Sequence, residues 1–113
     1  MTIFIENMFA EQLKCNGFAL YYYDKIKVGE IDFILEQNAD LLPVEIKSRK
    51  DYRSHKALNN LLAIKEFAIK EAKVFCTGNI EVEDNITYYP FYMIMFFQKQ
   101  EMASKIKFEK III

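Results

Sequence analysis

Between residues 18 and 47 the sequence consists of three apolar segments separated by two short polar turns. The segments at residues 18–23, 30–35 and 41–47 are rich in aromatic and branched side chains. Segments of this length and composition favour strands, and short turns favour hairpins between them. We therefore predict a three-strand antiparallel meander. Alternation along its middle strand predicts one buried face that consists of Ile31, Phe33 and Leu35.

A helix is expected on either side of this meander. In residues 4–16 the apolar side chains recur at helical spacing and form one stripe, which contains Ile5, Met8, Phe9 and Leu13. Gly17 follows, and glycine suits the left-handed conformation that often ends a helix. After the meander, Ser54 is a suitable N-cap for a second helix, whose apolar residues are Ala57, Leu58, Leu61, Leu62 and Phe67.

Two further apolar segments extend the predicted sheet. Residues 73–77 are typical of a fourth strand, and because they follow a helix they are expected to run parallel to a neighbour through a right-handed crossover. Residues 88–97 are a candidate fifth strand. The predicted fold class is therefore α/β, a mixed β-sheet flanked by helices, in the order helix, three-strand meander, helix, strand.

Length and composition indicate one domain. The 113 residues are 52% hydrophobic with three glycines and two prolines, so residues 1–97 can form a single core. Residues 98–113 are an extension, whose pattern fits either a strand or a helix up to Lys105. The net charge of −1 excludes a globally basic nucleic-acid binder but leaves local basic patches open.

The cysteines and the hydropathy pattern predict a cytoplasmic protein. Cys15 and Cys76 form no C-x-x-C pair and are too few for a disulfide scaffold, so we expect both to be buried thiols in a reducing compartment. No signal peptide is evident at the N-terminus. The longest apolar segment, residues 88–97, is about half a membrane span, so no membrane partner is expected.

The second hairpin brings two carboxyl groups and a lysine together. If it pairs Glu36 with Leu41, Asp32 falls opposite Glu45, and Lys47 projects from the same face two residues further on. Directly opposed side chains lie about 5 Å apart, where like charges destabilise a sheet unless a cation neutralises them. Mg²⁺ or Mn²⁺ prefers such carboxylate ligands.

This constellation is typical of a metal-dependent nuclease. Two acids on adjacent strands hold the metal, which lowers the pKa of a bound water, and an ammonium group orients the water or stabilises negative charge. Glu6, on the first helix, is a candidate further acid. The non-catalytic interpretation is an ion-pair ladder on a solvated sheet face, since the same register places Glu30 opposite Lys47.

Four blocks of the sequence carry a family resemblance: Ile5-Glu6-Asn7, Leu20-Tyr21-Tyr22, Gly29-Glu30-Ile31-Asp32-Phe33 and Leu42-Pro43-Val44-Glu45-Ile46-Lys47-Ser48. From about residue 3 to about residue 97, the chain resembles the C-terminal domain of unknown function attached to many prokaryotic AAA-type ATPases. That domain is considered similar to the PD-(D/E)XK, restriction-endonuclease-like fold. The resemblance implies a metal held by Asp32 and Glu45, a catalytic role for Lys47 and a helix-borne acid at Glu6.

The resemblance also implies partners. Members of the family usually follow an ATP-binding module, whereas this chain has no G-x-x-x-x-G-K-S/T motif, so we expect no ATP hydrolysis by the chain itself. Three functional classes stay open. The first is a Mg²⁺-dependent nuclease acting on DNA or RNA, the second a non-catalytic accessory or protein-interaction module of an AAA-type ATPase system, and the third a nucleic-acid binder without catalysis.

A basic segment follows the predicted site. Residues 47–56 contain five Lys or Arg against one Asp, and Arg49, Lys50 and Arg53 are candidate contacts to a phosphate backbone. A solvated loop is the alternative interpretation. His55, without a second histidine nearby, is expected at the surface.

The aromatic clusters at residues 21–23 and 88–92 have two interpretations. They are expected to form core and interface, including a possible homodimer contact, rather than to stack nucleic-acid bases.

Overall fold

One mixed six-stranded sheet organises the molecule. The computed structural model describes residues 2–99, and side chains from residue 4 onward. The strands are β1 (Tyr21–Lys25), β2 (Gly29–Gln37), β3 (Asp40–Ile46), β4 (Ala72–Cys76), β5 (Glu81–Glu83) and β6 (Ile86–Pro90). Their order in the sheet is β1-β2-β3-β4-β6-β5. The first three form the predicted antiparallel meander, β4 runs parallel to both β3 and β6, and β5 pairs antiparallel with β6.

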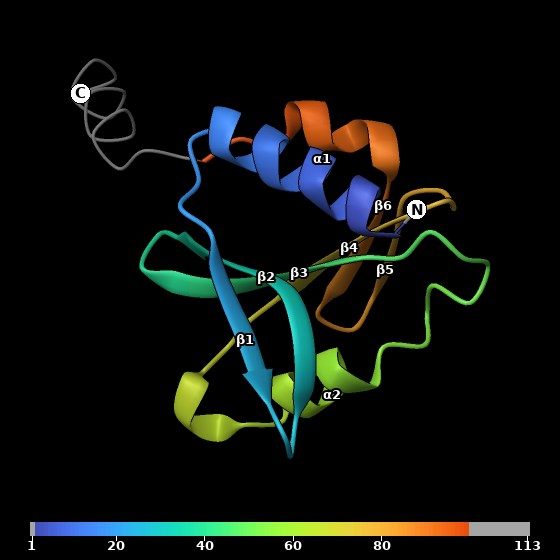
Figure 1. Ribbon diagram of the computed structural model, residues 1–113. Coiled ribbons are helices and arrows are strands. Elements are labelled where there is room, and N and C mark those ends of the chain that lie inside the picture. The colour runs from blue at the N-terminus through green and yellow to red at the C-terminus, as the bar shows by residue number, and fades with distance from the viewer. Residues whose placement is uncertain (1, 100–113) are drawn as a thin grey trace, which may run out of the picture.

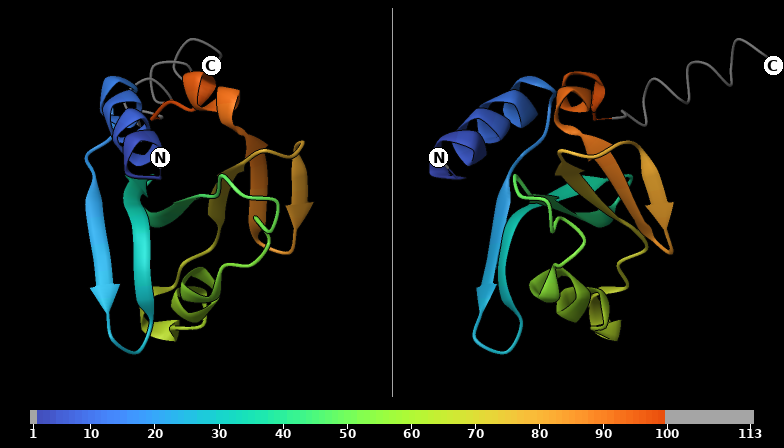
Figure 2. Two further views of the ribbon diagram at one scale, coloured as in Figure 1. Left: turned by 45° about the vertical axis from the view of Figure 1, so that its right-hand side comes forward. Right: turned by 90° about the vertical axis from the view of Figure 1, so that its right-hand side faces the viewer.

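Helices cover both faces of the sheet, as predicted. On one face lie α1 (Thr2–Cys15) and the 3₁₀ helix η2 (Phe91–Phe96), whereas α2 (Lys56–Leu62) and the short 3₁₀ helix η1 (Lys65–Phe67) lie against the other (Figures 1 and 2). The fold class is therefore mixed α/β. Gly17 follows α1 with a φ of 99°, which confirms the predicted left-handed end of this helix.

The core on the α1 face joins α1 to the centre of the sheet. It contains Phe9, Leu13, Phe18, Phe33, Leu35, Leu42, Val44, Ile46, Phe75 and Ile94. Met8, predicted in the same helical stripe, is instead 56% exposed. Cys15 is exposed as well, whereas Cys76 is buried as expected. The predictions for Met8 and Cys15 are wrong because both positions fall on the outer side of α1, seven residues apart.

A bulge in the first hairpin changes the face on which one predicted core residue lies. Between Tyr21 and Tyr23 the register of β1 against β2 shifts by one residue. The shift interrupts strict alternation along β2. Ile31 therefore packs with Ile34 against α2, whereas Phe33 packs on the α1 face. The predicted common face for Ile31 and Phe33 is wrong for this reason.

The second helix is shorter than predicted and begins differently. Its N-cap is His55 rather than Ser54, with no capping hydrogen bond from the side chain. The helix ends at Leu62, so Phe67 lies in the separate η1, which is followed by Ala68 in a left-handed conformation with a φ of 50°. In the sequence, apolar residues keep a spacing of about 3.6 residues across the position where the helix breaks. This spacing explains why the sequence predicts one long helix.

The last predicted strand is divided. Only Ile86–Pro90 is a strand, and the chain then enters η2. The spacing of Phe91, Ile94 and Phe97 by three residues places all three toward the α1-face core, as a 3₁₀ helix requires. The short strand β5 was not predicted, because its residues alternate between charged and apolar types over only three positions.

His55 is buried and not at the surface. Its side chain lies between α2 and β6, where Nε2 is 2.6 Å from the hydroxyl of Tyr88 and Nδ1 is 3.0 Å from Oδ1 of Asn59. Both ring nitrogens therefore have partners, which compensates for the loss of water. The surface prediction is wrong because the facing hydroxyl of Tyr88 comes from a strand more than thirty residues away.

Removing this hydroxyl tests the role of the pair. In Tyr88→Phe, Nε2 of His55 remains buried without a hydrogen-bond partner, and we expect a loss of about 1 to 3 kcal/mol in the free energy of unfolding. Urea denaturation measures this quantity. The control is Tyr21→Phe, at an exposed position in β1. Equal losses in the two variants would contradict a stabilising His55–Tyr88 hydrogen bond.

Within residues 2–99, no helix is long and apolar enough to cross a membrane. The strand or helix predicted in the C-terminal extension falls on residues 100–113, which lie outside the described residues.

Candidate functional site

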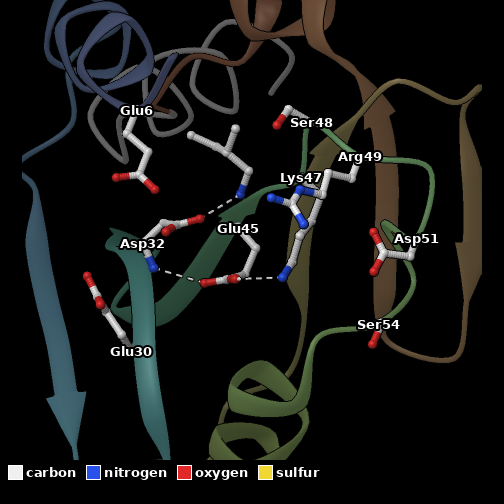
Figure 3. Close-up of a pocket in the computed structure, with 10 residues that line it drawn as sticks. Glu6, Glu30, Asp32, Glu45, Lys47, Ser48, Arg49, Asp51 and Ser54 are labelled. Carbon is white, nitrogen blue, oxygen red and sulfur yellow. Dashed lines mark hydrogen bonds and ion pairs between the residues drawn. The ribbon is translucent and has the colours of Figure 1, made fainter. Parts of the chain in front are cut away.

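The candidate site lies where β2 and β3 separate. Main-chain pairing follows the predicted register as far as Phe33 opposite Val44. One step further, side chains replace the main chain as acceptors. The backbone N–H of Asp32 donates to Oε1 of Glu45 at 2.8 Å, and the backbone N–H of Ile46 donates to Oδ2 of Asp32 at 2.8 Å (Figure 3). Each carboxyl group thus binds the strand that carries the other.

The sheet is irregular on both sides of Asp32. The β1–β2 bulge lies next to this residue on one side, and the opening between β2 and β3 lies on the other. Bulges often occur beside active sites, because they redirect a side chain that regular pairing would fix. The proximity of Asp32 and Glu45 follows from the predicted register, whereas the reciprocal hydrogen bonds follow from the opening of the strands.

An open pocket of about 430 Å³ covers this opening (Figure 3). Acids enter it from α1, β2 and β3, and the chain after β3 supplies the opposite wall. The lining residues are Glu6, Glu30, Asp32, Glu45, Ile46, Lys47, Ser48, Arg49, Asp51 and Ser54. The structure therefore brings together all four predicted catalytic residues and Arg49.

Sequence reasoning missed several lining residues. Ser48, Asp51 and Ser54 were not predicted, and Glu30 was considered only as a partner for Lys47. The spacing of Glu30 two positions before Asp32 was a usable signal for its place in the pocket. The serines gave no comparable signal, because their position depends on the path of an irregular loop.

Burial controls the electrostatics of the site. Glu45 is only 5% exposed, and this burial, together with the nearby charge of Asp32, raises its pKa from 4.5 to about 7. Burial also raises the pKa of Asp32. For Glu6, burial and then the charge and hydrogen bonding of Asp32 raise the pKa. Three carboxyl groups thus resist ionisation in one pocket.

Lys47 offsets only part of this negative charge. Its Nζ lies 3.9 Å from Oε2 of Glu45, and its backbone N–H donates to the carbonyl of Phe75 at 2.9 Å, just beyond the end of β3. The predicted opposition of Glu30 and Lys47 is replaced by this contact with Glu45. The ammonium group is thus held at the edge of the acidic cluster.

The basic segment at residues 47–56 contributes side chains to the pocket and to a second surface. Arg49 lines the site, whereas Lys50 and Arg53 line a shallow pocket on the outside of the loop. Arg53 forms an ion pair with Glu81 of β5, and its guanidinium lies 5.3 Å from the centre of the Tyr52 ring. Part of the predicted phosphate-binding charge therefore has a protein partner.

Contacts with the β4–β5 connection fix the same loop. The hydroxyl of Tyr52 lies so close to Gly78 that a Cβ atom there would be 2.6 Å from it. The Tyr52 ring also packs edge-on against Tyr88, at 5.7 Å between ring centres. These contacts and the Arg53–Glu81 ion pair anchor the loop at Tyr52 and Arg53. Residues 48–51, 53 and 54 are nevertheless exposed, which agrees with the alternative interpretation of a solvated loop.

The carboxylate oxygens of the site suit a hard divalent cation whose coordination shell is completed by other ligands. Among the described residues, no three carboxyl, histidine or cysteine side chains have the arrangement of a preformed metal site. Mg²⁺, however, commonly takes one or two carboxylates and completes its shell with waters and phosphate oxygens. The carboxyl groups of Asp32 and Glu45 each have a second oxygen that the backbone hydrogen bonds do not use. Their chemistry therefore fits Mg²⁺ or Mn²⁺.

Together the fold and the site define a mixed α/β domain with an acidic pocket bordered by a lysine and an arginine. Residues 2–94 match the family model described as Domain of unknown function (DUF4143), and the chain belongs to this family. This match agrees with the resemblance to a domain of unknown function found in the sequence. The comparisons with curated proteins and with solved structures gave no match.

Burial of Glu45 predicts an unusual dependence of stability on pH. The native protein holds the Glu45 proton up to about pH 7, whereas the ordinary pKa is 4.5, so the native state binds more protons between these values. The free energy of unfolding should therefore fall as pH rises through this window. At about 1.4 kcal/mol per pH unit, the total is roughly 3 kcal/mol. Urea denaturation in EDTA measures the profile.

Glu45→Gln isolates the contribution of this carboxyl group. Glutamine stays neutral and keeps an oxygen for the N–H of Asp32, so the variant should gain stability relative to wild type as pH rises. Glu36→Gln, at an exposed position near the other end of β2, is the control. A pH profile in Glu45→Gln that is parallel to wild type would contradict the raised pKa.

Proposed function

We propose that this domain binds Mg²⁺ or Mn²⁺ through Asp32 and Glu45 and hydrolyses phosphodiester bonds in DNA or RNA. One observation carries the proposal: a buried carboxyl group, that of Glu45, and a half-buried one, that of Asp32, each with a raised pKa, face each other beside Lys47 in an open pocket. Proteins rarely bury like charges together without a partner for them, and functional sites are the common exception. The resemblance to a domain of unknown function that is considered similar to the PD-(D/E)XK fold supports the same assignment.

Asp32 and Glu45 have a defined task in this proposal. Their backbone hydrogen bonds fix both carboxyl groups before any ligand arrives, so little side-chain entropy is lost on binding. The bound cation supplies a water of lowered pKa and polarises the phosphate. Because ligand carboxyl groups must be ionised, Glu45 has to release its proton before it binds the cation.

The remaining residues act on the substrate. Lys47 places an ammonium group next to Glu45, where it orients the attacking water or stabilises the negative charge on the phosphate. Glu6 approaches from α1 and supplies a further acid beside Asp32. Arg49 lines the same pocket and is positioned to contact a phosphate of the substrate. Lys50 and Arg53 contribute to a wider electrostatic surface along the loop.

One observation favours a second function, a non-catalytic accessory or protein-interaction module of an AAA-type ATPase system. Asp32 and Glu45 each satisfy a backbone N–H where β2 and β3 separate, so both acids also have a structural use. In this case the nuclease-like fold persists without turnover. The two functions differ in whether the site binds a cation.

Cation binding is the first test of the proposed site. Isothermal titration of Mg²⁺ and of Mn²⁺ should show one site, which Asp32→Asn and Glu45→Gln remove and Glu36→Gln retains. Because Glu45 releases a proton, the affinity should increase between pH 6 and pH 8. Each titration is repeated with a phosphorothioate oligonucleotide, since phosphate completes many Mg²⁺ sites. Equal binding by Asp32→Asn and wild type would contradict the proposed ligands.

Cleavage assays test the role of Lys47. Lys47→Met should bind the cation at least as tightly as wild type, because a neighbouring positive charge is lost. Its cleavage rate should fall about 100-fold or more, as expected when a group that stabilises the transition state is removed. Labelled single-stranded and duplex DNA and RNA serve as substrates, and Lys27→Met, in the exposed β1–β2 turn, is the control. Full cleavage by folded Lys47→Met would overturn the mechanism.

A further inference from the structure

A second feature, independent of the acidic pocket, is an apolar surface on the outer side of the helices. α1 and η2 lie side by side over one face of the sheet (Figures 1 and 2). Five large apolar side chains on these two helices are each more than half exposed. We call this set the outer helix face; it consists of Phe4, Met8, Tyr92, Met95 and Phe96.

Direct contacts hold the two helices of this face together. The rings of Phe9 and Phe91 lie 5.6 Å apart at their centres, near the beginning of η2. Near the other end, Nδ2 of Asn16 donates to the carbonyls of Ile94 and Phe97, both at 2.8 Å. Contacts at both ends fix η2 against α1, so the exposed side chains belong to one rigid layer. Rigid surfaces lose little conformational entropy when they bind.

The exposed apolar area of the outer helix face is at the upper end of the range for monomers. At about 150 to 250 Å² for each large side chain, more than half exposure of all five gives roughly 600 Å² of apolar surface. The largest apolar patch on a typical monomer is about 300 to 600 Å². A stable protein interface buries about 800 Å² on each partner. The outer helix face therefore provides about three quarters of the area that one partner of a stable interface buries, and a polar rim has to provide the rest.

We propose that the outer helix face binds a second copy of this chain in a two-fold symmetric dimer. The net charge of −1 gives two copies little mutual repulsion. The rim on α1 carries both signs of charge, since Glu11 and Lys14 are exposed beside the apolar residues. A two-fold contact presents the same surface twice, so a rim with both signs complements itself. An apolar centre with such a rim is the usual anatomy of an interface.

The oligomeric state of the full chain tests the proposal. Sedimentation equilibrium over a wide concentration range should show a monomer–dimer equilibrium. Met8→Lys and Met95→Lys place a charge within the outer helix face, and each should raise the dimer dissociation constant at least tenfold. Val82→Lys, at an exposed apolar position on β5 at the far edge of the sheet, is the matched control and should dimerise as wild type.

Alkylation of Cys15 gives an independent measurement. This exposed thiol lies seven residues from Met8, on the same side of α1, whereas Cys76 is buried. Its alkylation should slow as the protein concentration rises, and Met8→Lys should remove that dependence. A monomer at all concentrations, or a dimer unaffected by both lysine variants, would overturn the proposal. If alkylation is equally slow at every concentration, another part of the same chain covers the outer helix face. This result would also overturn the proposal.

Discussion

Two reciprocal hydrogen bonds between β2 and β3 determine how the candidate site is built. The carboxyl group of Asp32 accepts a backbone N–H from β3, and that of Glu45 accepts one from β2. These contacts hold the two strands together after their main-chain pairing ends, so the sheet can open there without leaving unpaired N–H groups. The same contacts hold the buried Glu45 and the half-buried Asp32 side by side. Asp32 and Glu45 therefore stabilise the opening of the sheet and, at the same time, concentrate negative charge unfavourably.

Three elements enclose this charge. Glu6 enters from α1, which core packing through Phe9 and Leu13 fixes on the sheet. The loop after β3 supplies the opposite wall, and Tyr52, packed against Gly78, limits its freedom. The pocket is accordingly bordered by the packed helix α1 and by an exposed loop that is anchored at Tyr52, and its floor is the irregular part of the sheet. For the proposed metal site, this arrangement would let a cation replace protons on the acids without rearrangement of the backbone, as a preorganised site requires.

The two faces of the sheet differ in what they leave exposed. On the α2 face the side chain of His55 is buried, and both of its ring nitrogens have hydrogen-bond partners. The α1 face has a well-packed inner side, but the outer side of its helices exposes large apolar residues such as Met8 and Phe96. Periodicity predicts that a residue is apolar and helical, but it does not say how wide the buried stripe is. For this reason Met8 was assigned to the core.

The sequence by itself determined the order of α1, the three-strand meander, α2 and β4, the register of the second hairpin and the proximity of Asp32, Glu45 and Lys47. These depend on local periodicity and on one short turn, which a few consecutive residues specify. Only the tertiary structure decided that Ile31 faces α2, that His55 is buried and that Glu6 reaches the pocket. Each of these depends on residues distant in the chain, through a bulge, a hydroxyl from β6 and the packing of α1, and no local pattern encodes such contacts.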